Sequence, residues 1–481
     1  MTDTPQRPNP ADAFSTLALP ESQLENLTRL GYHAMTPVQA ASLPLALAGD
    51  DLIVQAKTGS GKTAAFALVL LNNLERAATP PQEAQPGGPR FAVQALVLCP
   101  TRELADQVTM EIRRLARSED NIKTLTLCGG TPLHGQKASL AHGAHIVVGT
   151  PGRIIDHLTR GHLTLDALNT LVLDEADRML DMGFADEIAT VVKQCPRQRQ
   201  TLLFSATYPE GIAQLSARFL RSPKEVKLKG QHAQSKIEQR CYEVIEVDRL
   251  DAVGKLLNHF RPVSTLAFCN TRQQCRDLVE VLRAQGIAAL ALHGELEQRE
   301  RDQVLVQFAN RSCSVLVATD VASRGLDIAQ LEAVINVDVT PDPQVHIHRI
   351  GRTGRADEQG LVLSLVSLDE MGSIGKIEAM QGTESRWYPL AELVAKPGGP
   401  LQPPMQTLHI TGGRKDKIRP GDVLGALTGE AGFTAAQIGK INVNEFSTYV
   451  AVERVIAHEA VRRLGAGKVK GKRVKVRLME A

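Results

Sequence analysis

The sequence lacks paired cysteines and lacks any long apolar run. Its seven cysteines are scattered singly, without a CxxC pair, which argues against a disulfide framework or a structural zinc site and favours a reducing compartment. No stretch of about 18 apolar residues occurs, so a membrane-spanning helix is not expected. The opening residues, MTDTPQRPNPADAF, have neither the basic start nor the apolar core of a secretion signal. These absences predict a cytoplasmic protein without a membrane partner.

Charge is nearly balanced over the chain but is distributed unevenly along it. The 481 residues have a formal net charge of +2, yet residues 401–481 hold 14 Lys and Arg against 7 Asp and Glu. The first 400 residues therefore have a net charge of −5. A basic C-terminal segment on a mildly acidic body predicts a polyanionic partner.

Short apolar runs alternate with helical patterns over most of the chain, which predicts an α/β fold with parallel sheets. Runs typical of strands buried on both faces lie at 51–55, 95–99, 144–148, 171–173 and 202–204. The pattern then restarts, with strand candidates at 265–269, 288–292, 315–318, 333–337 and 361–366. Polar or Pro/Gly-rich segments separate these units. We expect domains at 1–220, 241–395 and 405–481, with linkers at 221–240 and 396–404.

The segment AKTGSGKT, residues 56–63, lies between a predicted buried strand and a predicted helix, which is the context of a P-loop. Glycines let the backbone amides face phosphate, and the helix N-terminus favours anions. Lys62 is expected to reach the β- and γ-phosphates, and the Thr63 hydroxyl to hold Mg²⁺. The nucleotide-binding residues predicted here are Thr58, Gly59, Ser60, Gly61, Lys62 and Thr63.

Asp174 and Glu175 follow the apolar run LVL. Alone, such a pair is more often a solvated strand end, but a P-loop in the same sheet makes it a candidate catalytic pair. We expect Asp174 to hold the metal and Glu175 to act as the base for the attacking water.

The tetrad at 174–177 reads DEAD, and the chain resembles the DEAD-box RNA helicases over residues 14–370. The matching motifs are PTREL (100–104), GG (129–130), TPGR (150–153), SAT (205–207), FCNTR (268–272), RGLD (324–327) and HRIGRTGR (348–355). The resemblance implies two tandem RecA-like P-loop domains that clamp ATP, with Mg²⁺, and single-stranded RNA between them.

The resemblance also implies roles for residues around the nucleotide. Gln39 would hydrogen-bond the adenine edge, with Phe14 upstream of it and Tyr32 near the ring. Asp174 and Asp327 complete the predicted nucleotide contacts, Asp327 on the ribose.

A second set of implied residues makes hydrolysis depend on domain closure. Arg352 and Arg355 match arginine fingers in the second domain, which reach the γ-phosphate only when the two domains close. Ser205, Thr207 and His348 would couple hydrolysis to that movement.

Further matched positions imply contacts to the RNA backbone, and such contacts give affinity without sequence preference. They are Arg102, Gly130, Thr150 and Arg153 in the first domain, and Arg272 and Thr319 in the second. Contacts to 2′-hydroxyls would favour RNA over DNA.

The segment 405–481 has a strand and helix order that suits an RNA-recognition-motif fold. Tyr449 fits one of the two usual base-stacking positions, but Ser447 replaces the other, so stacking on the open sheet is in doubt. The residues predicted to bind RNA here are Arg414, Lys415, Lys417, Tyr449, Lys470, Lys472 and Arg473.

This segment, with RKDKIRPGDVLGALTG at 414–429, IGKINV and FSTYVAV, resembles the RNA-binding domain of the DbpA subfamily of bacterial helicases. That resemblance implies binding to a 23S ribosomal RNA hairpin near the peptidyl-transferase centre and a role on pre-50S particles, by a monomer. Four alternatives remain: a general helicase of the cold-shock or mRNA-turnover type, an ATP-locked RNA clamp, a DNA translocase, and a basic surface that only raises RNA affinity. The end at Ala481, without a long basic tail, favours the DbpA type over the cold-shock type.

Overall fold

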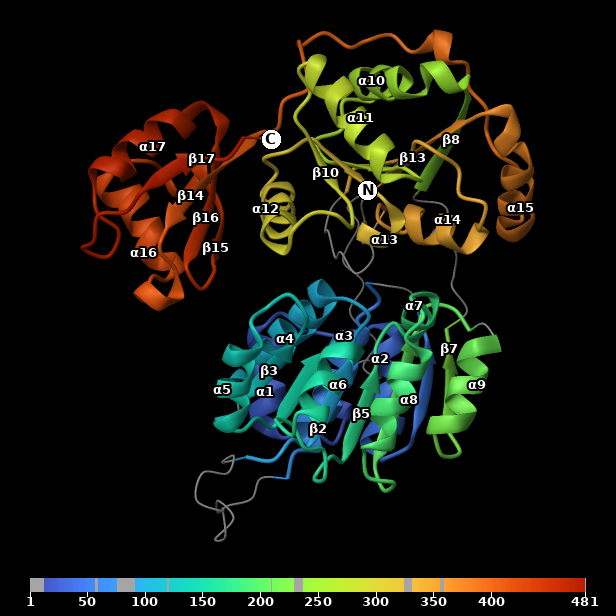
Figure 1. Ribbon diagram of the computed structural model, residues 1–481, viewed down its shortest axis with the longest axis vertical. Helices are drawn as coiled ribbons and strands as arrows, with labels where there is room; N and C mark the ends of the chain where they lie inside the picture. The colour runs from blue at the N-terminus through green and yellow to red at the C-terminus, as the bar shows by residue number, and fades with distance from the viewer. Residues whose placement is uncertain are drawn as a thin grey trace, which may run out of the picture. The chain divides into compact units, whose positions relative to one another are not determined.

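The computed structural model describes residues 13–56, 59–75, 91–118, 121–208, 210–228, 237–323, 331–354 and 359–480. Contacts divide the chain into two compact units, formed mainly by residues 1–231 (unit 1) and residues 232–481 (unit 2). Figure 1 labels their elements. No helix of the described residues is long and apolar enough to cross a membrane.

Unit 1 contains a seven-stranded parallel sheet with the order β3-β4-β2-β5-β6-β1-β7. Its strands are β1 (Leu52–Gln55), β2 (Ala95–Leu98), β3 (Thr124–Leu127), β4 (Ile146–Gly149), β5 (Thr170–Leu173), β6 (Gln200–Ser205) and β7 (Lys224–Lys227). The central strands β2, β4 and β5 are buried at every position and almost entirely apolar, because helices cover both faces of the sheet.

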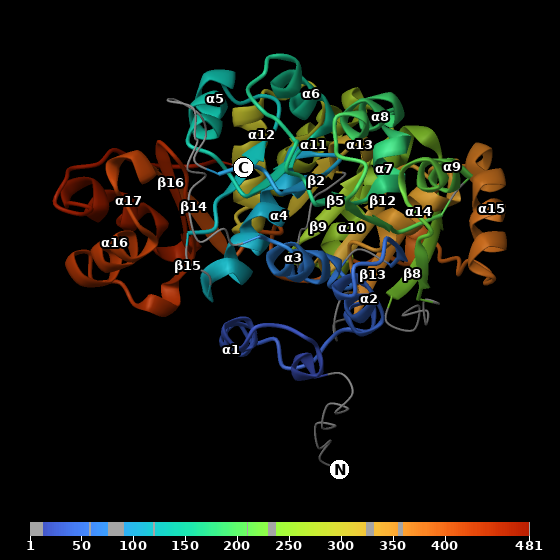
Figure 2. The ribbon, with the colours of Figure 1, turned by 90° about the horizontal axis from the view of Figure 1, so that it is seen from below.

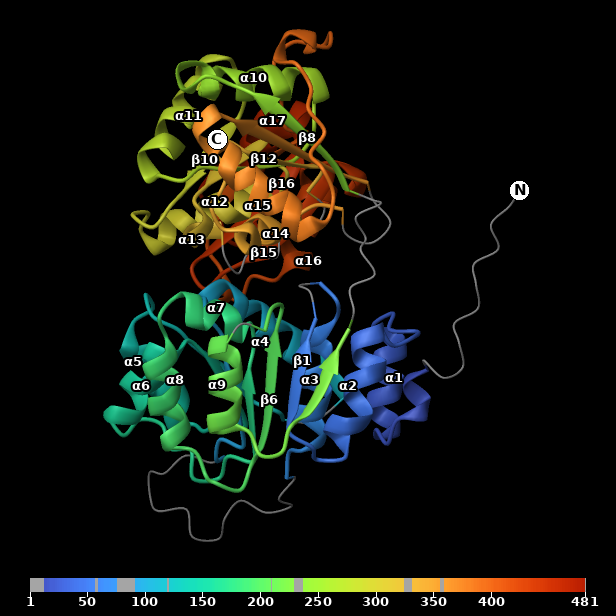
Figure 3. The ribbon, with the colours of Figure 1, turned by 90° about the vertical axis from the view of Figure 1, so that its right-hand side faces the viewer.

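Those helices form two layers, which Figure 3 shows on opposite sides of the sheet. One layer consists of α1 (Glu21–Arg29), α2 (Pro37–Leu47), α3 (Lys62–Asn72) and α4 (Arg102–Leu115). The other consists of α5 (Leu133–Ala141), α6 (Pro151–Thr159), α7 (Ala176–Asp181), α8 (Ala185–Lys193) and α9 (Glu210–Phe219). Successive strand residues therefore point into different cores: Val97 packs with the first layer, whereas Leu96 and Leu98 pack with the second.

Unit 2 begins with a six-stranded parallel sheet of order β10-β11-β9-β12-β13-β8. Its strands are β8 (Ile237–Glu243), β9 (Thr265–Phe268), β10 (Ala289–Leu292), β11 (Val315–Ala318), β12 (Ala333–Asn336) and β13 (Gly360–Val366). Its helices are α10 (Arg249–Phe260), α11 (Arg272–Ala284), α12 (Gln298–Ala309), α13 (Asp320–Ser323), α14 (Pro343–Ile350) and α15 (Met371–Gln381).

The C-terminal module within unit 2 has an antiparallel sheet of order β15-β16-β14-β17. Its elements are β14 (Met405–Thr411), α16 (Pro420–Gly425), β15 (Ile438–Val443), β16 (Ser447–Glu453), α17 (Ala457–Ala466) and β17 (Val476–Leu478). Both helices lie on one face of this sheet (Figure 2) and share its core. The first and third strands in chain order, β14 and β16, are the two central strands of the sheet, as in an RNA-recognition motif. The predicted fold class is confirmed: two parallel-sheet RecA-like domains and a small α+β domain.

The centre of the module's sheet face opposite its helices is buried. Thr407 and Tyr449 are 0% and 5% exposed. The Thr407 hydroxyl lies 2.7 Å from the Ser312 hydroxyl and accepts a hydrogen bond from the Asn310 amide at 3.1 Å. The sheet face that stacks bases in many RNA-recognition motifs thus contacts the loop after α12.

The segment 221–240, which we expected to be a linker, contains β7 and the start of β8. Its polar composition has a physical cause, because β7 is an edge strand beside β1 and buries only Val226. Residues 229–236 lie outside the described residues.

All seven cysteines are free and buried. Burial raises the pKa of the Cys128 and Cys313 thiols to about 12. It raises the pKa of Cys195 and Cys241 to about 11. Thiols in such surroundings stay protonated and unreactive.

Asp51 stabilises the junction of three strands in unit 1. Its carboxylate accepts hydrogen bonds from the backbone amides of Thr201 and Arg221, each at 2.7 Å. Replacing it by alanine leaves two amides without acceptors, at a cost of about 1–3 kcal/mol each. We predict that Asp51→Ala accelerates amide hydrogen exchange in β1 and β7, and that Asp51→Asn has a smaller effect. Unchanged exchange in both variants would contradict this role.

Candidate functional site

The loop after β1 is shaped by contacts with residues at the start of α2. Gly61 has a φ of 94°, and a Cβ atom there would meet the Gln39 amide nitrogen at 2.7 Å. That nitrogen donates to the Gly61 carbonyl oxygen at 3.1 Å, while the Gln39 side-chain oxygen accepts from the Thr36 amide at 2.8 Å. Only glycine fits here. The residue predicted to read adenine therefore contacts the phosphate-binding loop directly.

Lys62 and Thr63 begin α3, as the P-loop pattern predicts. Lys62 is 6% exposed, and its ammonium donates to the Ala56 carbonyl oxygen at 2.8 Å. Gly59 and Ser60 complete the described part of the loop, and Gly59 also has a positive φ, of 80°. Thr58 lies outside the described residues.

Asp174 and Glu175 follow β5 and are 2% and 6% exposed. Burial raises the pKa of Asp174 to about 7, although the Lys62 ammonium acts to lower it. Glu175 adopts a left-handed φ of 51°, and its carboxylate forms an ion pair with the Arg178 guanidinium. The structure thus brings the acidic pair and the phosphate-binding loop together at one edge of the sheet.

Asp177 connects the acidic motif with the SAT segment after β6, a role that sequence reasoning missed. Its Oδ2 accepts from the Ala206 and Thr207 amides at 3.1 and 2.8 Å, and from the Thr207 hydroxyl at 2.8 Å. The Ser205 hydroxyl donates to the Thr207 carbonyl oxygen at 2.6 Å. Of the two predicted coupling residues of unit 1, Thr207 is therefore bonded directly to the DEAD tetrad, and Ser205 is bonded to Thr207. The sequence did offer a signal for this role, because Asp177 is the fourth residue of the DEAD motif.

Phe14 and Tyr32 form a separate aromatic pair. Their ring centroids are 6.3 Å apart in an edge-to-face arrangement. The Tyr32 hydroxyl hydrogen-bonds the Glu111 carboxylate, and the Arg114 guanidinium lies 5.7 Å from its ring centroid. Burial and the Glu111 carboxylate raise the Tyr32 pKa. These two residues therefore attach the N-terminal segment to α4.

The four residues predicted to contact RNA in unit 1 come together at the other half of the same sheet edge, after β2, β3 and β4. A Cβ atom on Gly130 would meet the Arg102 guanidinium at 1.8 Å, so these two residues touch. Thr150 caps α6, and the Arg153 guanidinium donates to the Thr131 carbonyl oxygen at 3.1 Å.

Arg349, inside the HRIGRTGR motif, organises the corresponding edge of unit 2, and sequence reasoning gave it no role. It is 1% exposed and forms two 2.7 Å hydrogen bonds with the Asp320 carboxylate. It also donates to the Asp338 carbonyl oxygen at 2.7 Å. The predicted residues His348 and Arg352 lie on and just after the same helix, α14, and Arg352 is buried. Arg355 and Asp327 lie outside the described residues.

The predicted RNA contacts of unit 2 lie at the same carboxyl edge. Arg272 begins α11 and pairs with the Glu295 carboxylate at 2.9 Å, with more than half of its side chain exposed. Thr319 follows β11 and is 9% exposed.

In the module, Arg414, Lys415, Lys417, Lys470, Lys472 and Arg473 are exposed on its loops. Tyr449 differs from them, because it is buried beside His409 with ring centroids 5.1 Å apart.

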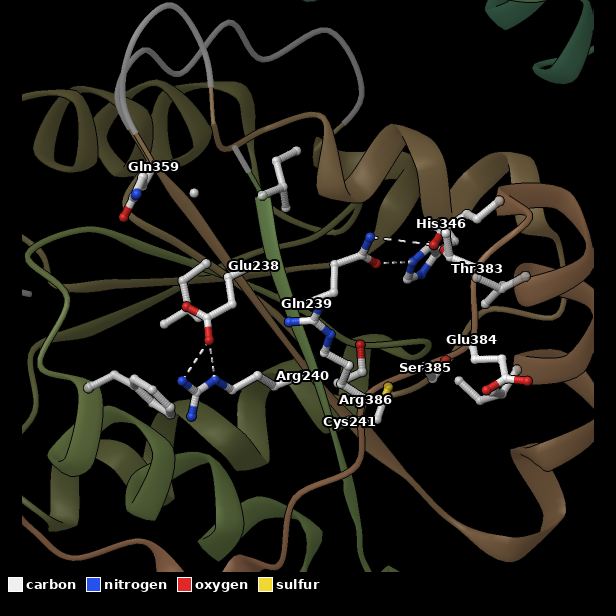
Figure 4. Close-up of a pocket in the computed structure, with 18 residues that line it drawn as sticks. Glu238, Gln239, Arg240, Cys241, His346, Gln359, Thr383, Glu384, Ser385 and Arg386 are labelled. Atoms are coloured by element: carbon white, nitrogen blue, oxygen red, sulfur yellow. Dashed lines mark hydrogen bonds and ion pairs between the residues drawn. The ribbon is translucent and has the colours of Figure 1, made fainter. Parts of the chain in front are cut away.

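A cavity of 720 Å³ in unit 2 lies alongside β8, where α14, α15 and residues 383–386 surround it (Figure 4). The Gln239 amide at its centre makes long contacts with His346, at 3.5 Å, and Gln381, at 3.4 Å. Burial lowers the pKa of His346 to about 4. None of the lining residues was predicted to contact ATP or RNA.

A phosphate-binding loop facing a buried acidic pair, followed by a second parallel sheet, defines a tandem RecA-like ATPase. Family models match the chain as DEAD/DEAH box helicase at 36–215, helicase conserved C-terminal domain at 248–357 and DbpA RNA binding domain at 407–478. The chain belongs to the DEAD-box ATP-dependent RNA helicases of the DbpA type.

Individual relatives agree with this assignment. The chain is 52% identical over 471 residues to the ATP-dependent RNA helicase DbpA of Escherichia coli, covering 97% of this chain and 100% of that protein. It is 41% identical over 378 residues to the helicase CshA of Listeria monocytogenes, covering 78% and 70%. The structure of S. cerevisiae Dbp5 bound to RNA and ADP BeF3 is similar with a TM-score of 0.70 and 28% identity, covering 79% and 96%. The chain is an RNA helicase that uses ATP and binds RNA.

The raised pKa of Asp174 predicts a pH-dependent cost to the stability of unit 1. Its folded-state pKa of about 7 exceeds the ordinary value of 3.8. Stability therefore falls as pH rises from about 4 to about 7, where the unfolded chain loses the proton first. We predict that Asp174→Asn raises the melting temperature without nucleotide at pH 8, and that this gain shrinks toward pH 4.

Thermal melts across that pH range check the Asp174 prediction. The matched control is Asp166→Asn, because Asp166 is exposed. A gain that does not vary with pH would contradict the stated cause.

Proposed function

We propose that this helicase separates short RNA duplexes during large ribosomal subunit assembly, guided by its module to a hairpin of 23S rRNA. The main support is one observation: an edge of unit 1 with a phosphate-binding loop and a buried acidic pair is joined, in one chain, to a basic module that matches the DbpA RNA binding domain over residues 407–478. The buried free thiols suit a reducing cytoplasm.

The residues at the ATP site fit a magnesium ion. Mg²⁺ prefers hard oxygen ligands and keeps several waters, so few protein ligands suffice. The buried Asp174 carboxylate and the Thr63 hydroxyl supply such oxygens, and Lys62 supplies a cation for the phosphates. When bound, the ion would neutralise charge on the phosphate oxygens. Gln39 would turn from the loop to the adenine edge.

Glu175 is the proposed base for the attacking water. Its carboxylate is paired with the Arg178 guanidinium, which fixes the position of the side chain after β5. Arg352 and Arg355 would complete the site when ATP and RNA bring the two units together, with His348, Ser205 and Thr207 coupling closure to hydrolysis.

The proposed RNA path uses backbone contacts from both units, and these do not depend on base sequence. In unit 1 it includes Arg102, Gly130, Thr150 and Arg153, which the sheet edge brings together. In unit 2 it includes Arg272 and Thr319. The module's exposed cations would then choose which RNA the motor acts on.

The second candidate is a clamp that uses ATP only to lock onto RNA. Glu175 favours turnover, because a pure clamp does not need a base. Single-turnover separation of a short duplex beside the hairpin distinguishes the two: hydrolysis without strand release would support the clamp.

We predict that Glu175→Gln binds ATP with an affinity close to that of the parent but loses hydrolysis by at least about 100-fold, the lower range for general-base catalysis. Lys62→Ala, in contrast, loses ATP binding itself. Nucleotide titration and RNA-stimulated phosphate release measure the two effects. Because Glu175→Gln leaves the Arg178 charge buried, a thermal melt must show that it stays folded. Loss of ATP binding in a folded Glu175→Gln variant would contradict the base assignment.

We predict that deleting Met405–Ala481 removes the preference for the 23S rRNA hairpin while weak ATPase stimulation by bulk RNA remains. The deletion uncovers Asn310 and Ser312, which are polar and can be hydrated. ATPase stimulation by the hairpin fragment, compared with an unrelated RNA of equal length, measures the preference. If the preference survives the deletion, the residues that select the RNA lie in the two RecA-like domains and not in the module.

A further inference from the structure

One end of the module gathers exposed cations on neighbouring loops. The Arg414 amide donates to the Asn444 carbonyl oxygen at 2.8 Å, and the Lys415 amide donates to the Glu445 carbonyl oxygen at 3.0 Å. The Lys470 ammonium contacts the Lys417 carbonyl oxygen. These bonds join the turn after β14, the β15–β16 hairpin and the turn before β17 into one surface, called here the loop edge.

The loop edge has a positive net charge. Its cations are Arg414, Lys415, Lys417, Lys470, Lys472 and Arg473. Three carboxylates accompany them: Glu445 pairs with Lys415 at 3.2 Å, Asp422 with Lys470 at 3.4 Å, and Asp416 with Lys472 at 3.9 Å. Three positive charges remain in excess, and exposed surface pairs are weak enough to exchange for phosphates.

Phe446 is exposed on the β15–β16 hairpin, which is part of the loop edge that holds these cations. Of the module's three aromatic side chains, Phe433 and Tyr449 are 9% and 5% exposed, whereas Phe446 is 67% exposed. A large exposed phenyl ring contributes nothing to the core and keeps apolar surface in water. An aromatic ring among cations is the composition that single-stranded nucleic acid recognises.

The backbone around Phe446 is held in place. Its carbonyl oxygen accepts from the Gly412 amide at 3.1 Å, and the Asn444 amide donates to the Ser447 carbonyl oxygen at 2.8 Å. The ring is therefore presented on a fixed hairpin, so little backbone entropy is lost when a base covers it.

The usual stacking face of this fold cannot serve the same purpose. Tyr449 lies on the buried side of the sheet, and Thr407 on that face is bonded to Ser312. Any aromatic contact between the module and a base must come from elsewhere on its surface, and Phe446 is the exposed aromatic ring it offers.

We propose that Phe446 stacks on an unpaired base of the bound RNA while the surrounding cations hold the adjacent phosphates. The inference rests on the proposed function and deepens it, because it predicts that the RNA must present an unpaired base beside a charged backbone. Fully paired RNA of equal charge would then be a poorer ligand.

The test uses the full-length chain and two RNA probes. One is a 23S rRNA hairpin fragment with 2-aminopurine at one loop position at a time, and the other is a blunt duplex with the same number of phosphates. Phe446→Ala should weaken binding to the hairpin by about 5- to 150-fold, the range for one stacked base, and leave duplex binding unchanged. Phe446→Tyr and Phe446→Trp should retain binding. The 2-aminopurine signal at the stacked position should respond to the parent and not to Phe446→Ala.

Two control variants separate stacking from other causes. Val455→Ala truncates an apolar side chain that is 87% exposed outside the loop edge, and it should change neither probe's affinity. Lys472→Ala should lower the slope of log affinity against log salt by about 1, whereas Phe446→Ala should leave that slope unchanged.

If the parent and Phe446→Ala bind the hairpin with equal affinity, the inference is wrong. The exposed ring would then be assigned to a contact with a protein. Equal losses on hairpin and duplex would also overturn it, because stacking requires an unpaired base. If the parent binds an unrelated stem-loop as tightly as the 23S hairpin, the proposed target fails instead. The stacking comparison can then still be made on that stem-loop.

Discussion

Parallel strand pairing in unit 1 is the constraint on which both halves of its functional edge depend. Parallel strands end at a common edge, so the chain must leave the sheet there before each helix. The register pairs Leu98 with both Gly149 and Leu173, which aligns the ends of β2, β4 and β5. One half of the edge, after β1, β5 and β6, holds the residues predicted to bind the nucleotide. The other half, after β2, β3 and β4, holds the residues predicted to contact RNA.

The alternation of apolar runs and helical patterns was sufficient to predict the fold, because strands buried on both faces leave an unbroken apolar signature. The motifs predicted the nucleotide residues because each motif is a short pattern of neighbouring residues. Side-chain partnerships between distant segments could not be predicted in this way. Asp177 binds Thr207 and Arg349 binds Asp320 because the fold brings their loops together. The edge strand β7 was missed because only Val226 is buried in it.

The module illustrates how packing redirects a binding surface. Its strand order is that of an RNA-recognition motif, yet Tyr449 is buried and Thr407 is bonded to Ser312. Because the centre of this sheet face is in contact with the loop after α12, other surfaces must bind the RNA, and one of them is the loop edge with its exposed cations. Composition alone showed a basic module, and its folded form shows that six of its cations lie together on the loop edge.

The burial of every cysteine has a practical consequence for studying the motor. Native thiols with a raised pKa react slowly with maleimides, so a cysteine added at an exposed position would be labelled first. Fluorophores could be attached to the full chain without removing any native sulfur. A donor in unit 1 and an acceptor in unit 2 would then follow the opening and closing of a single molecule in real time.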